Sequence, residues 1–240
     1  MLKVKKSKLV LERKYNNTPI MEIGIDEAGR GPLFGRVYSA AVVLPNNEEF
    51  KYELLKDSKK FTSDKKINEV ADYIKNNALF WAVSYEDEKM IDSINIRQAT
   101  LSCMHKSIKE LLIQFNDMQN ISSNCYLLVD GNDFKPYTYY CELSNIIKQI
   151  NHILVEGGDN KFCSIAAASI LAKVERDKYI REMCCNFPKL HIYYGLLTNK
   201  GYGTSKHREG IEKYGISKWH RATYGCCKEA LINDDEFYNS

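Results

Sequence analysis

The chain has 240 residues, with 44% hydrophobic and 27% charged side chains and a formal net charge of +3 at pH 7. This composition is typical of an ordinary globular protein of one or two domains, large enough to bury a substantial core. No apolar run approaches the roughly 20 residues that a helix needs to cross a bilayer, so we expect no membrane partner.

The amino-terminal residues are strongly basic. Six lysine and arginine residues against one glutamate give the first fourteen residues a charge of +5, and we treat residues 1–20 as a basic N-terminal segment. Such a segment can attach weakly to a polyanion, but a solubilising terminus is the more common role and the one we favour slightly. It lacks the apolar core and cleavage site of a signal peptide, and the eight cysteines include no CxxC pair. We therefore expect a cytoplasmic protein with reduced thiols.

Five short apolar runs predict β-strands, at residues 21–26, 37–44, 78–85, 125–131 and 152–157. Helical patterns appear at residues 63–75, 94–115, 164–184 and roughly 205–232. The early strands have little helix between them, whereas the late strands are separated and followed by helices. This order predicts an α/β fold with a mixed sheet, antiparallel early and parallel late. We expect a core over residues 21–190 and a C-terminal helical segment over 191–240.

The first strand ends in the stretch "GIDEAGRGP", which begins at Gly24. Asp26 and Glu27 are adjacent, and neighbouring side chains on a regular strand point to opposite faces. We therefore expect the strand to break at this point so that both acids can serve one site. Gly29 and Gly31 permit the tight backbone path that such a break needs. A solvated turn carrying two charges is the alternative interpretation.

Two further aspartates follow late strands. Asp130 ends "CYLLVD", and Asp159 lies between "ILVEGG" and the long helix. Ligand sites of open sheets gather at the carboxyl ends of parallel strands, and four carboxylates at one edge would repel each other without divalent cations. Oxygen donors select Mg²⁺ or Mn²⁺, and two such ions roughly 3.5–4 Å apart can drive phosphodiester hydrolysis. A helix N-cap for Asp159 and a turn position for Asp130 remain alternatives.

Seven motifs, in order, resemble the signatures of ribonuclease HII, the type 2 ribonuclease H, in its bacterial-type branch. They cover about residues 9 to 224 and read "GIDEAGRGPLFGRV", "KDSKK", "INIRQAT", "LLVDG", "GGDNKFCSIAAASILAKVERD", "NKGYGT" and "ISKWHRATY". The resemblance implies a ribonuclease H-like fold with a central five-stranded sheet flanked by helices. It also implies a metal-dependent endonuclease that cuts RNA paired with DNA.

The resemblance assigns roles to individual residues. It implies that the metal-binding catalytic carboxylates are Asp26, Glu27, Asp130 and Asp159, with two Mg²⁺ or Mn²⁺ ions. It implies that Gly29, Arg30 and Gly31 recognise the ribonucleotide, and that Tyr202 stacks at the ribo–deoxyribo junction. The expected activity includes cutting 5′ of a single ribonucleotide in duplex DNA, leaving 3′-hydroxyl and 5′-phosphate ends, as in ribonucleotide excision repair.

Four more residues match substrate contacts of the family. Lys59 and Lys173 resemble phosphate contacts, as does Lys60 beside Lys59 in "KDSKK", and Asn95 and Gln98 resemble contacts to the DNA strand. A solvated lysine face is the alternative for the lysines, more readily for Lys60 than for Lys173, and a helix cap is the alternative for Asn95.

Several positions suggest structural roles or depart from the family. His207 and His220 are expected to be structural, because the metals can do the acid–base work. Arg36 stands where the family usually has proline, Asn160 stands where a small residue is common, and "HRATY" replaces the usual HRxSF. These departures remove no catalytic group.

Two other functions remain open. A different ribonuclease H-like nuclease, such as a resolvase, would share the acidic edge but needs no sensor for a 2′-hydroxyl. A non-catalytic nucleic-acid-binding subunit would be indicated by the loss of a carboxylate, and all four are present. We expect a monomer whose partners are RNA–DNA hybrids and ribonucleotide-containing duplex DNA.

Overall fold

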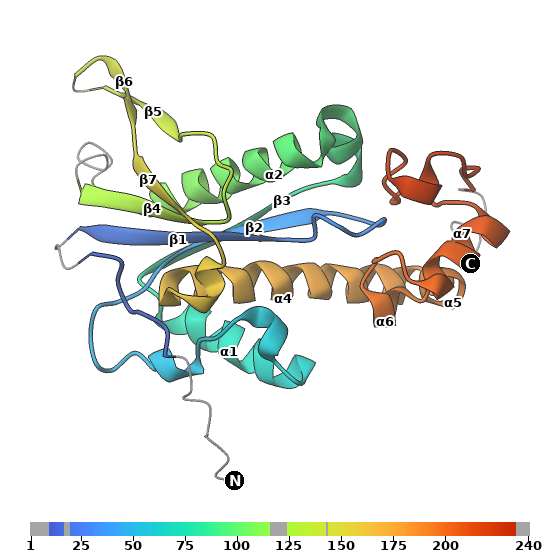
Figure 1. The fold of residues 1–240 in the computed structure, drawn as a ribbon, viewed down its shortest axis with the longest axis horizontal. Helices are drawn as coiled ribbons and strands as arrows, with labels where there is room; N and C mark the ends of the chain where they lie inside the picture. The colour runs from blue at the N-terminus through green and yellow to red at the C-terminus, as the bar shows by residue number, and fades with distance from the viewer. Residues whose placement is uncertain (1–9, 17–19, 116–123, 143, 234–240) are drawn as a thin grey trace, which may run out of the picture.

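A computed structural model describes residues 10–16, 20–115, 124–142 and 144–233 of the chain. Its centre is a twisted five-stranded sheet with helices on both faces (Figure 1). The strands of this sheet are β1 (Met21–Ala28), β2 (Val37–Val43), β3 (Phe80–Glu86), β4 (Cys125–Asp130) and β7 (Asn151–Val155). The expected five-stranded α/β architecture is therefore confirmed.

The strand order in space is β3-β2-β1-β4-β7. Strands β1, β2 and β3 pair antiparallel, whereas β4 runs parallel to β1 and β7 runs parallel to β4. This confirms the prediction of a sheet that is antiparallel early and parallel late. Because β1, β4 and β7 run in the same direction, their carboxyl ends lie at one edge of the sheet.

One face of the sheet is covered by α1 (Asp64–Asn77) and the long helix α4 (Cys163–Asn186). Helix α4 starts against β1 at Gly24, where an added Cβ would lie 2.1 Å from the carbonyl carbon of Ser164. Buried alanines at 166, 167 and 168 continue this close contact. The small residues therefore set how near α4 comes to the sheet, and they place its middle turns beside the end of β1.

The other face packs against α2 (Glu88–Leu112), whose Met104, Ile108 and Leu111 meet apolar side chains of β1, β2 and β4. Two helical pieces are joined in α2 at Asn95, which has a φ of 66°. The predicted helix over residues 94–115 corresponds to the piece after this kink. The first turns, from Glu88, were not predicted.

A hairpin between β4 and β7 was also not predicted. It consists of β5 (Thr138–Cys141) and β6 (Ile146–Gln149), and it projects from the end of the sheet at the top left of Figure 1. Most of its side chains are exposed. The alternation of apolar and polar residues that marks a half-buried strand is therefore missing from its sequence.

The C-terminal part packs around the second half of α4 and contains α5 (Lys189–Tyr194), α6 (Leu196–Asn199) and α7 (Ser205–Tyr214). The prediction of one helical region over roughly 205–232 is wrong beyond Tyr214. Helix α7 stops at Gly215, which has a φ of +75°. The following residues form turns and the single 3₁₀ turn η5 (Gly225–Cys227), held by hydrogen bonds to distant parts of the chain.

Three short 3₁₀ turns complete the described structure: η1 (Tyr52–Leu54), η2 (Ser58–Lys60) and η4 (Gly158–Asn160). All eight cysteines are free thiols, as expected. Within the described ranges, no helix is both long and apolar enough to cross a membrane. Residues 1–9 and 17–19 of the predicted basic segment lie outside the described residues.

Candidate active site

One pocket of about 350 Å³ gathers most of the side chains that the sequence analysis singles out. It lies where the carboxyl ends of β1 and β4 meet η2, the middle of α4 and the turn after α6. Nine of the twelve predicted site residues border it: Asp26, Glu27, Gly29, Arg30, Gly31, Lys59, Asp130, Lys173 and Tyr202. The other three, Asn95, Gln98 and Asp159, do not.

The expectation that the first strand breaks at its two acids is wrong. Strand β1 continues to Ala28, and Asp26 and Glu27 stay in register with Ala40 and Ser39 of β2. On its other side, however, the pairing of β1 with β4 ends at Ile25. The sheet is therefore open next to both acids, and side chains from opposite faces of β1 border the same pocket.

Three carboxyl groups in the pocket have raised pKa values. Burial raises the pKa of Asp26 well above its ordinary value, and the charges of Glu27 and Asp130 raise it further. Burial also raises the pKa of Glu27, against the lowering effect of Arg30, whose guanidinium lies 3.3 Å from the Glu27 carboxylate. The pKa of Asp130 is raised by burial and by the charge of Asp159. Negative charge at this site therefore costs free energy in the protein alone, and a bound cation would relieve that cost.

Asp159 lies beside this cluster but not on the pocket wall. It is buried in η4, and its Oδ1 accepts a hydrogen bond of 2.9 Å from the side-chain amide of Asn160. The same amide donates to Asp57 Oδ2 at 3.2 Å. Asp159 does not cap α4, because the residue before that helix is Phe162, which makes no side-chain cap. Asn160 thus links Asp159, through Asp57, to the turn η2 that contains Lys59.

The donor set fits a hard divalent cation in its chemistry. Asp26, Glu27 and Asp130 offer only carboxylate oxygens, which suit Mg²⁺ or Mn²⁺. In the part of the chain that the structure describes, no three His, Cys, Asp or Glu side chains are arranged to hold an ion. The pocket therefore supplies the correct ligand types for such an ion.

The glycine-rich turn and Tyr202 lie next to each other on the pocket wall. Gly29 has a φ of +98°, and a Cβ there would lie 2.3 Å from Nε of Arg176, so only glycine fits. A Cβ at Gly31 would lie 3.5 Å from the ring of Tyr202. The Tyr202 side chain is 49% exposed, and the Arg176 guanidinium lies 5.8 Å from the centre of its ring. Tyr202 therefore offers a free aromatic face next to the turn.

The predicted lysine and amide contacts divide into two groups. Lys59 and Lys173 border the pocket, and the Lys173 ammonium pairs with Asp177 at 2.8 Å. Asn95 and Gln98 are exposed on α2, away from the pocket wall. Asn95 Oδ1 accepts a 3.1 Å hydrogen bond from the amide of Gln98, so Asn95 caps the helical piece that follows the kink. This cap agrees with the alternative interpretation and leaves the DNA contact untested.

Sequence reasoning did not single out several residues of the pocket wall. They are Ser58, Ser169, Arg176, Asp177, Asn199 and Lys200. Arg176 and Asp177 belong to the motif "AKVERD", which is a usable signal because the polar face of α4 turns toward β1 there. Ser58 and Ser169, whose hydroxyl oxygens lie 3.0 Å apart, also lie in quoted motifs, "KDSKK" and "GGDNKFCSIAAASILAKVERD", so the same signal was available for them.

His207 and His220 form a buried pair, as expected for structural histidines. Their Nε2 atoms are 3.0 Å apart, and Nδ1 of His207 donates to the backbone carbonyl of Tyr202 at 3.0 Å. Nδ1 of His220 accepts from the amide of Ser217 at 3.1 Å. Burial lowers the pKa of both histidines, and the neighbouring imidazole lowers that of His220 further.

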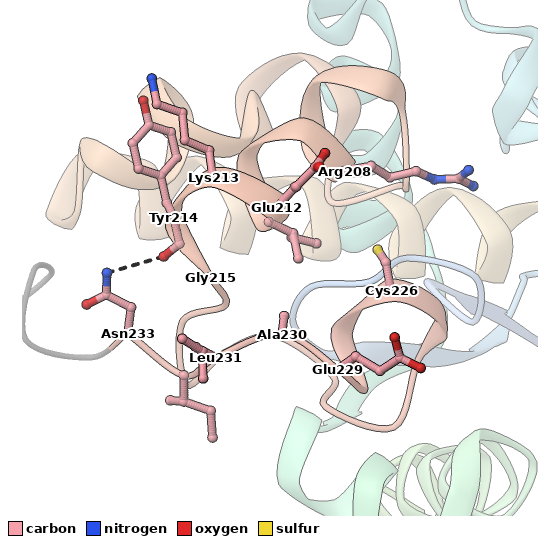
Figure 2. Close-up of a pocket in the computed structure, with 12 residues that line it drawn as sticks. Arg208, Glu212, Lys213, Tyr214, Gly215, Cys226, Glu229, Ala230, Leu231 and Asn233 are labelled. Atoms are coloured by element: carbon pink, nitrogen blue, oxygen red, sulfur yellow. Dashed lines mark hydrogen bonds between the residues drawn. The ribbon is translucent and has the colours of Figure 1, made fainter.

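A larger hollow, of about 770 Å³, lies elsewhere, between α7 and the chain after η5 (Figure 2). Asn233 donates to the carbonyl of Tyr214 at 3.2 Å across its far end. None of the twelve predicted site residues borders this hollow. Size alone is therefore a poor guide here, and the smaller pocket with its carboxylates is the candidate active site.

Comparisons with known proteins identify relatives over most of the chain. The family model of ribonuclease HII matches residues 23–227 of the chain. The ribonuclease HII of Parabacteroides distasonis is 42% identical over 217 residues, which is 90% of this chain and 96% of that protein. At 40% identity, the ribonuclease HII of Phocaeicola vulgatus matches 210 residues, 88% of this chain and 92% of that protein.

Solved structures share the fold. The ribonuclease H2 of Pyrococcus horikoshii OT3 gives a TM-score of 0.67 at 20% identity, covering 92% of this chain and 100% of that one. Bst-RNase HIII in complex with Mn²⁺ gives a TM-score of 0.61 at 19% identity, covering 88% of this chain and 68% of that one.

Proposed function

The chain belongs to the ribonuclease HII family, and from this premise we propose that it is a metal-dependent endonuclease that also cuts 5′ of single ribonucleotides in duplex DNA. As a member of the family it is a type 2 ribonuclease H, an endoribonuclease acting on RNA–DNA hybrids. One observation carries the finer proposal: the carboxylates of Asp26, Glu27 and Asp130, the turn at residues 29–31 and the exposed ring of Tyr202 border a single pocket.

The proposed ion site consists of Asp26, Glu27, Asp130 and the adjacent Asp159. Mg²⁺ or Mn²⁺, when bound there, would activate the attacking water and stabilise the leaving oxygen. The raised carboxyl pKa values support this site, because a bound cation offsets both the burial of the charges, which is the larger cause, and their mutual repulsion. The backbone amide of Gly158 donates a hydrogen bond to Oδ1 of Asp130 and so fixes the orientation of this carboxylate.

Recognition of the substrate is assigned to groups that surround the carboxylates. The backbone of Gly29 and Gly31 and the side chain of Arg30 would meet the ribose, whose 2′-hydroxyl distinguishes RNA from DNA. Tyr202 would stack on the sugar or base at the junction. Lys59 and Lys173 would contact phosphates, and Asn95 with Gln98, farther along the surface, would contact the DNA strand.

This assignment supports the division of the chain that the sequence suggests. Residues 21–190 would form the catalytic core, because the proposed metal ligands and phosphate-binding lysines lie there. Residues 191–240 would contribute substrate contacts, because Tyr202 extends the pocket wall from that segment.

The test is cleavage of two substrates, an RNA–DNA hybrid and a DNA duplex with one ribonucleotide, each with EDTA, Mg²⁺ or Mn²⁺. The proposal expects both to be cut only with a divalent ion. Cleavage in EDTA would contradict the metal dependence. Cleavage of the hybrid without cleavage at the lone ribonucleotide would contradict the proposed recognition while leaving the family activity intact.

A further inference from the structure

Arg221 lies behind the turn at residues 29–31 and is fully buried, the largest such side chain among the described residues. Its guanidinium donates to three backbone carbonyls, with Nε 2.9 Å from the oxygen of Gly35, Nη1 2.9 Å from that of Arg30 and Nη2 2.6 Å from that of Gly29. These carbonyls are almost two hundred positions away in the sequence. One C-terminal side chain thus binds two carbonyls of the turn and one of the segment that follows it.

The position of Arg221 is itself well defined. Its backbone amide donates to the carbonyl of Leu33 at 2.8 Å. The next two residues are anchored to Asp92 of α2, which accepts from the amides of Ala222 and Thr223 at 2.7 and 3.0 Å. Within the described residues, no carboxylate forms an ion pair with Arg221. Burial lowers its pKa to about 10, so the guanidinium remains charged at neutral pH and makes strong hydrogen bonds.

The bonds to Gly29 and Arg30 determine where the following amides point. In a trans peptide unit, the carbonyl and the N–H point in opposite directions, and the structure has no cis peptide bond in its described part. When the carbonyls of residues 29 and 30 face Arg221, the N–H groups of residues 30 and 31 face away from it. Both residues border the pocket, and neither amide donates to an acceptor in the part of the chain that the structure describes.

A second side chain, that of Tyr224, also binds the backbone carbonyl of Arg30. The hydroxyl of Tyr224 donates to the oxygen of Arg30 at 3.1 Å, and its ring lies 5.1 Å from the Arg221 guanidinium. Tyr224 is half-buried, so its hydroxyl can be removed without opening the core. The Arg30 carbonyl is thus held by two donors from the C-terminal segment.

We propose that Arg221, assisted by Tyr224, is a positioning residue for ribonucleotide recognition, because it orients the amides of Arg30 and Gly31 toward the 2′-hydroxyl and the neighbouring phosphate. The inference rests on the proposed function, in which this backbone meets the ribose. Arg221 does not touch the substrate, and it acts only through the peptide units that it binds. Lysine cannot replace it, because one ammonium group does not span three carbonyls in fixed directions.

The experiment compares binding of two duplexes of identical sequence, one all-DNA and one with a single ribonucleotide, in EDTA so that neither is cut. The readout is the ratio of the two dissociation constants. Tyr224→Phe removes one hydrogen bond and should reduce the preference for the ribonucleotide about fivefold. Arg221→Lys should reduce it tenfold or more. The matched controls are Tyr73→Phe on α1, whose hydroxyl bonds the amide of Lys51, and Arg181→Lys, whose partner is Asp64. Neither control should change the ratio.

Each outcome has a defined meaning. A wild-type protein without any preference would overturn the proposed recognition and this inference together. A wild-type preference that Tyr224→Phe and Arg221→Lys leave unchanged would overturn the inference alone, as would an equal loss of affinity for both duplexes. If Arg221→Lys does not fold, Tyr224→Phe still decides the question. Hydrogen exchange of residues 29–35 in that variant should then be faster, with the exchange of β1 and β2 unchanged.

Discussion

Asp130, at the end of β4, accepts a hydrogen bond from the backbone amide of Gly158, with 2.6 Å between its Oδ1 and the nitrogen. This bond ties the carboxyl end of one strand to the turn that carries Asp159. Asp130→Asn keeps an oxygen for the bond but removes a charge from the proposed ion site. We expect cleavage with Mg²⁺ to fall about 1000-fold, since ion-mediated charge stabilisation contributes several kcal/mol.

The matched control for this variant is Asp133→Asn, three residues away. Asp133 is paired with Arg97 outside the pocket wall, so its loss should leave turnover unchanged. Asp130→Asn should also raise the unfolding temperature in EDTA, because the raised pKa of Asp130 means that its charged form destabilises the fold. Turnover of Asp130→Asn within tenfold of the wild type would show that this carboxylate is not an ion ligand.

Tyr202 provides a test of substrate recognition that leaves the carboxylates intact. Tyr202→Ala removes the exposed ring and should lower cleavage at a single ribonucleotide by 10- to 100-fold, since one stacking contact contributes about 1–3 kcal/mol. Cleavage of a long RNA–DNA hybrid should fall less, because no junction need be stacked there. Tyr202→Phe keeps the ring and serves as the control. Equal losses on both substrates for Tyr202→Ala would argue against a junction sensor.

Lys59 and Lys60 allow a matched comparison of phosphate binding. Lys59 borders the pocket, whereas the ammonium of Lys60 is engaged by Asn160 and lies 3.9 Å from Asp57. Lys59→Ala should weaken duplex binding and reduce the slope of log K against log salt by about 0.9, the value for one lost phosphate contact. Lys60→Ala should leave that slope unchanged. The measurement is fluorescence anisotropy of a labelled duplex at several salt concentrations in EDTA, and equal slopes for wild type and Lys59→Ala would remove Lys59 from the interface.

The buried pair of His207 and His220 predicts a loss of stability in acid. Both pKa values are lowered in the folded protein, so the unfolded chain takes up protons first as the pH falls below about 6.5. Each histidine that stays neutral in the fold then lowers the free energy of unfolding by about 1.4 kcal/mol per pH unit. The contribution of the two neutral histidines to stability is complete above about pH 6.5 and is lost progressively below it.

The raised carboxyl pKa values at the pocket act in the opposite direction, because those groups hold protons more tightly when folded. The readout is therefore a difference. Urea unfolding at pH 7.5 and 5.5 should show that acidification lowers the free energy of unfolding of the wild type relative to that of His207→Gln. Identical pH dependence would mean that His207 does not stay neutral in the fold.

Much of the fold could be predicted because apolar runs and their order carry the information. The five strands and the change from antiparallel to parallel pairing follow from short runs near the amino terminus and helices later on. The C-terminal segment could not be predicted in this way. Residues 216–233 are held by bonds to distant backbone, such as those of Arg221, and such contacts leave no local periodicity.

The candidate active site, like the fold, could be predicted only in part. The motif around Asp26 and the strand-end position of Asp130 could be predicted, because acids at strand ends are a local signal. The course of β1 past Asp26 was missed, since its pairing with Ser39 and Tyr38 of β2 is decided by the partner strand. The environment of Arg36 could not be predicted either. Its guanidinium lies 3.9 Å from the ring centre of Tyr85 and 4.5 Å from that of Tyr179, and these three residues are far apart in the sequence.

We propose that this pocket directs hydrolysis to the 5′ side of one ribonucleotide with an external water as nucleophile. The most direct measurement uses a duplex with one ribonucleotide, labelled on either side of it, and maps the cut and its ends after incubation with Mg²⁺ or Mn²⁺. We expect a cut on the 5′ side, with a 3′-hydroxyl on one fragment and a 5′-phosphate on the other. A 2′,3′-cyclic phosphate would contradict it, because that product requires attack by the 2′-hydroxyl itself.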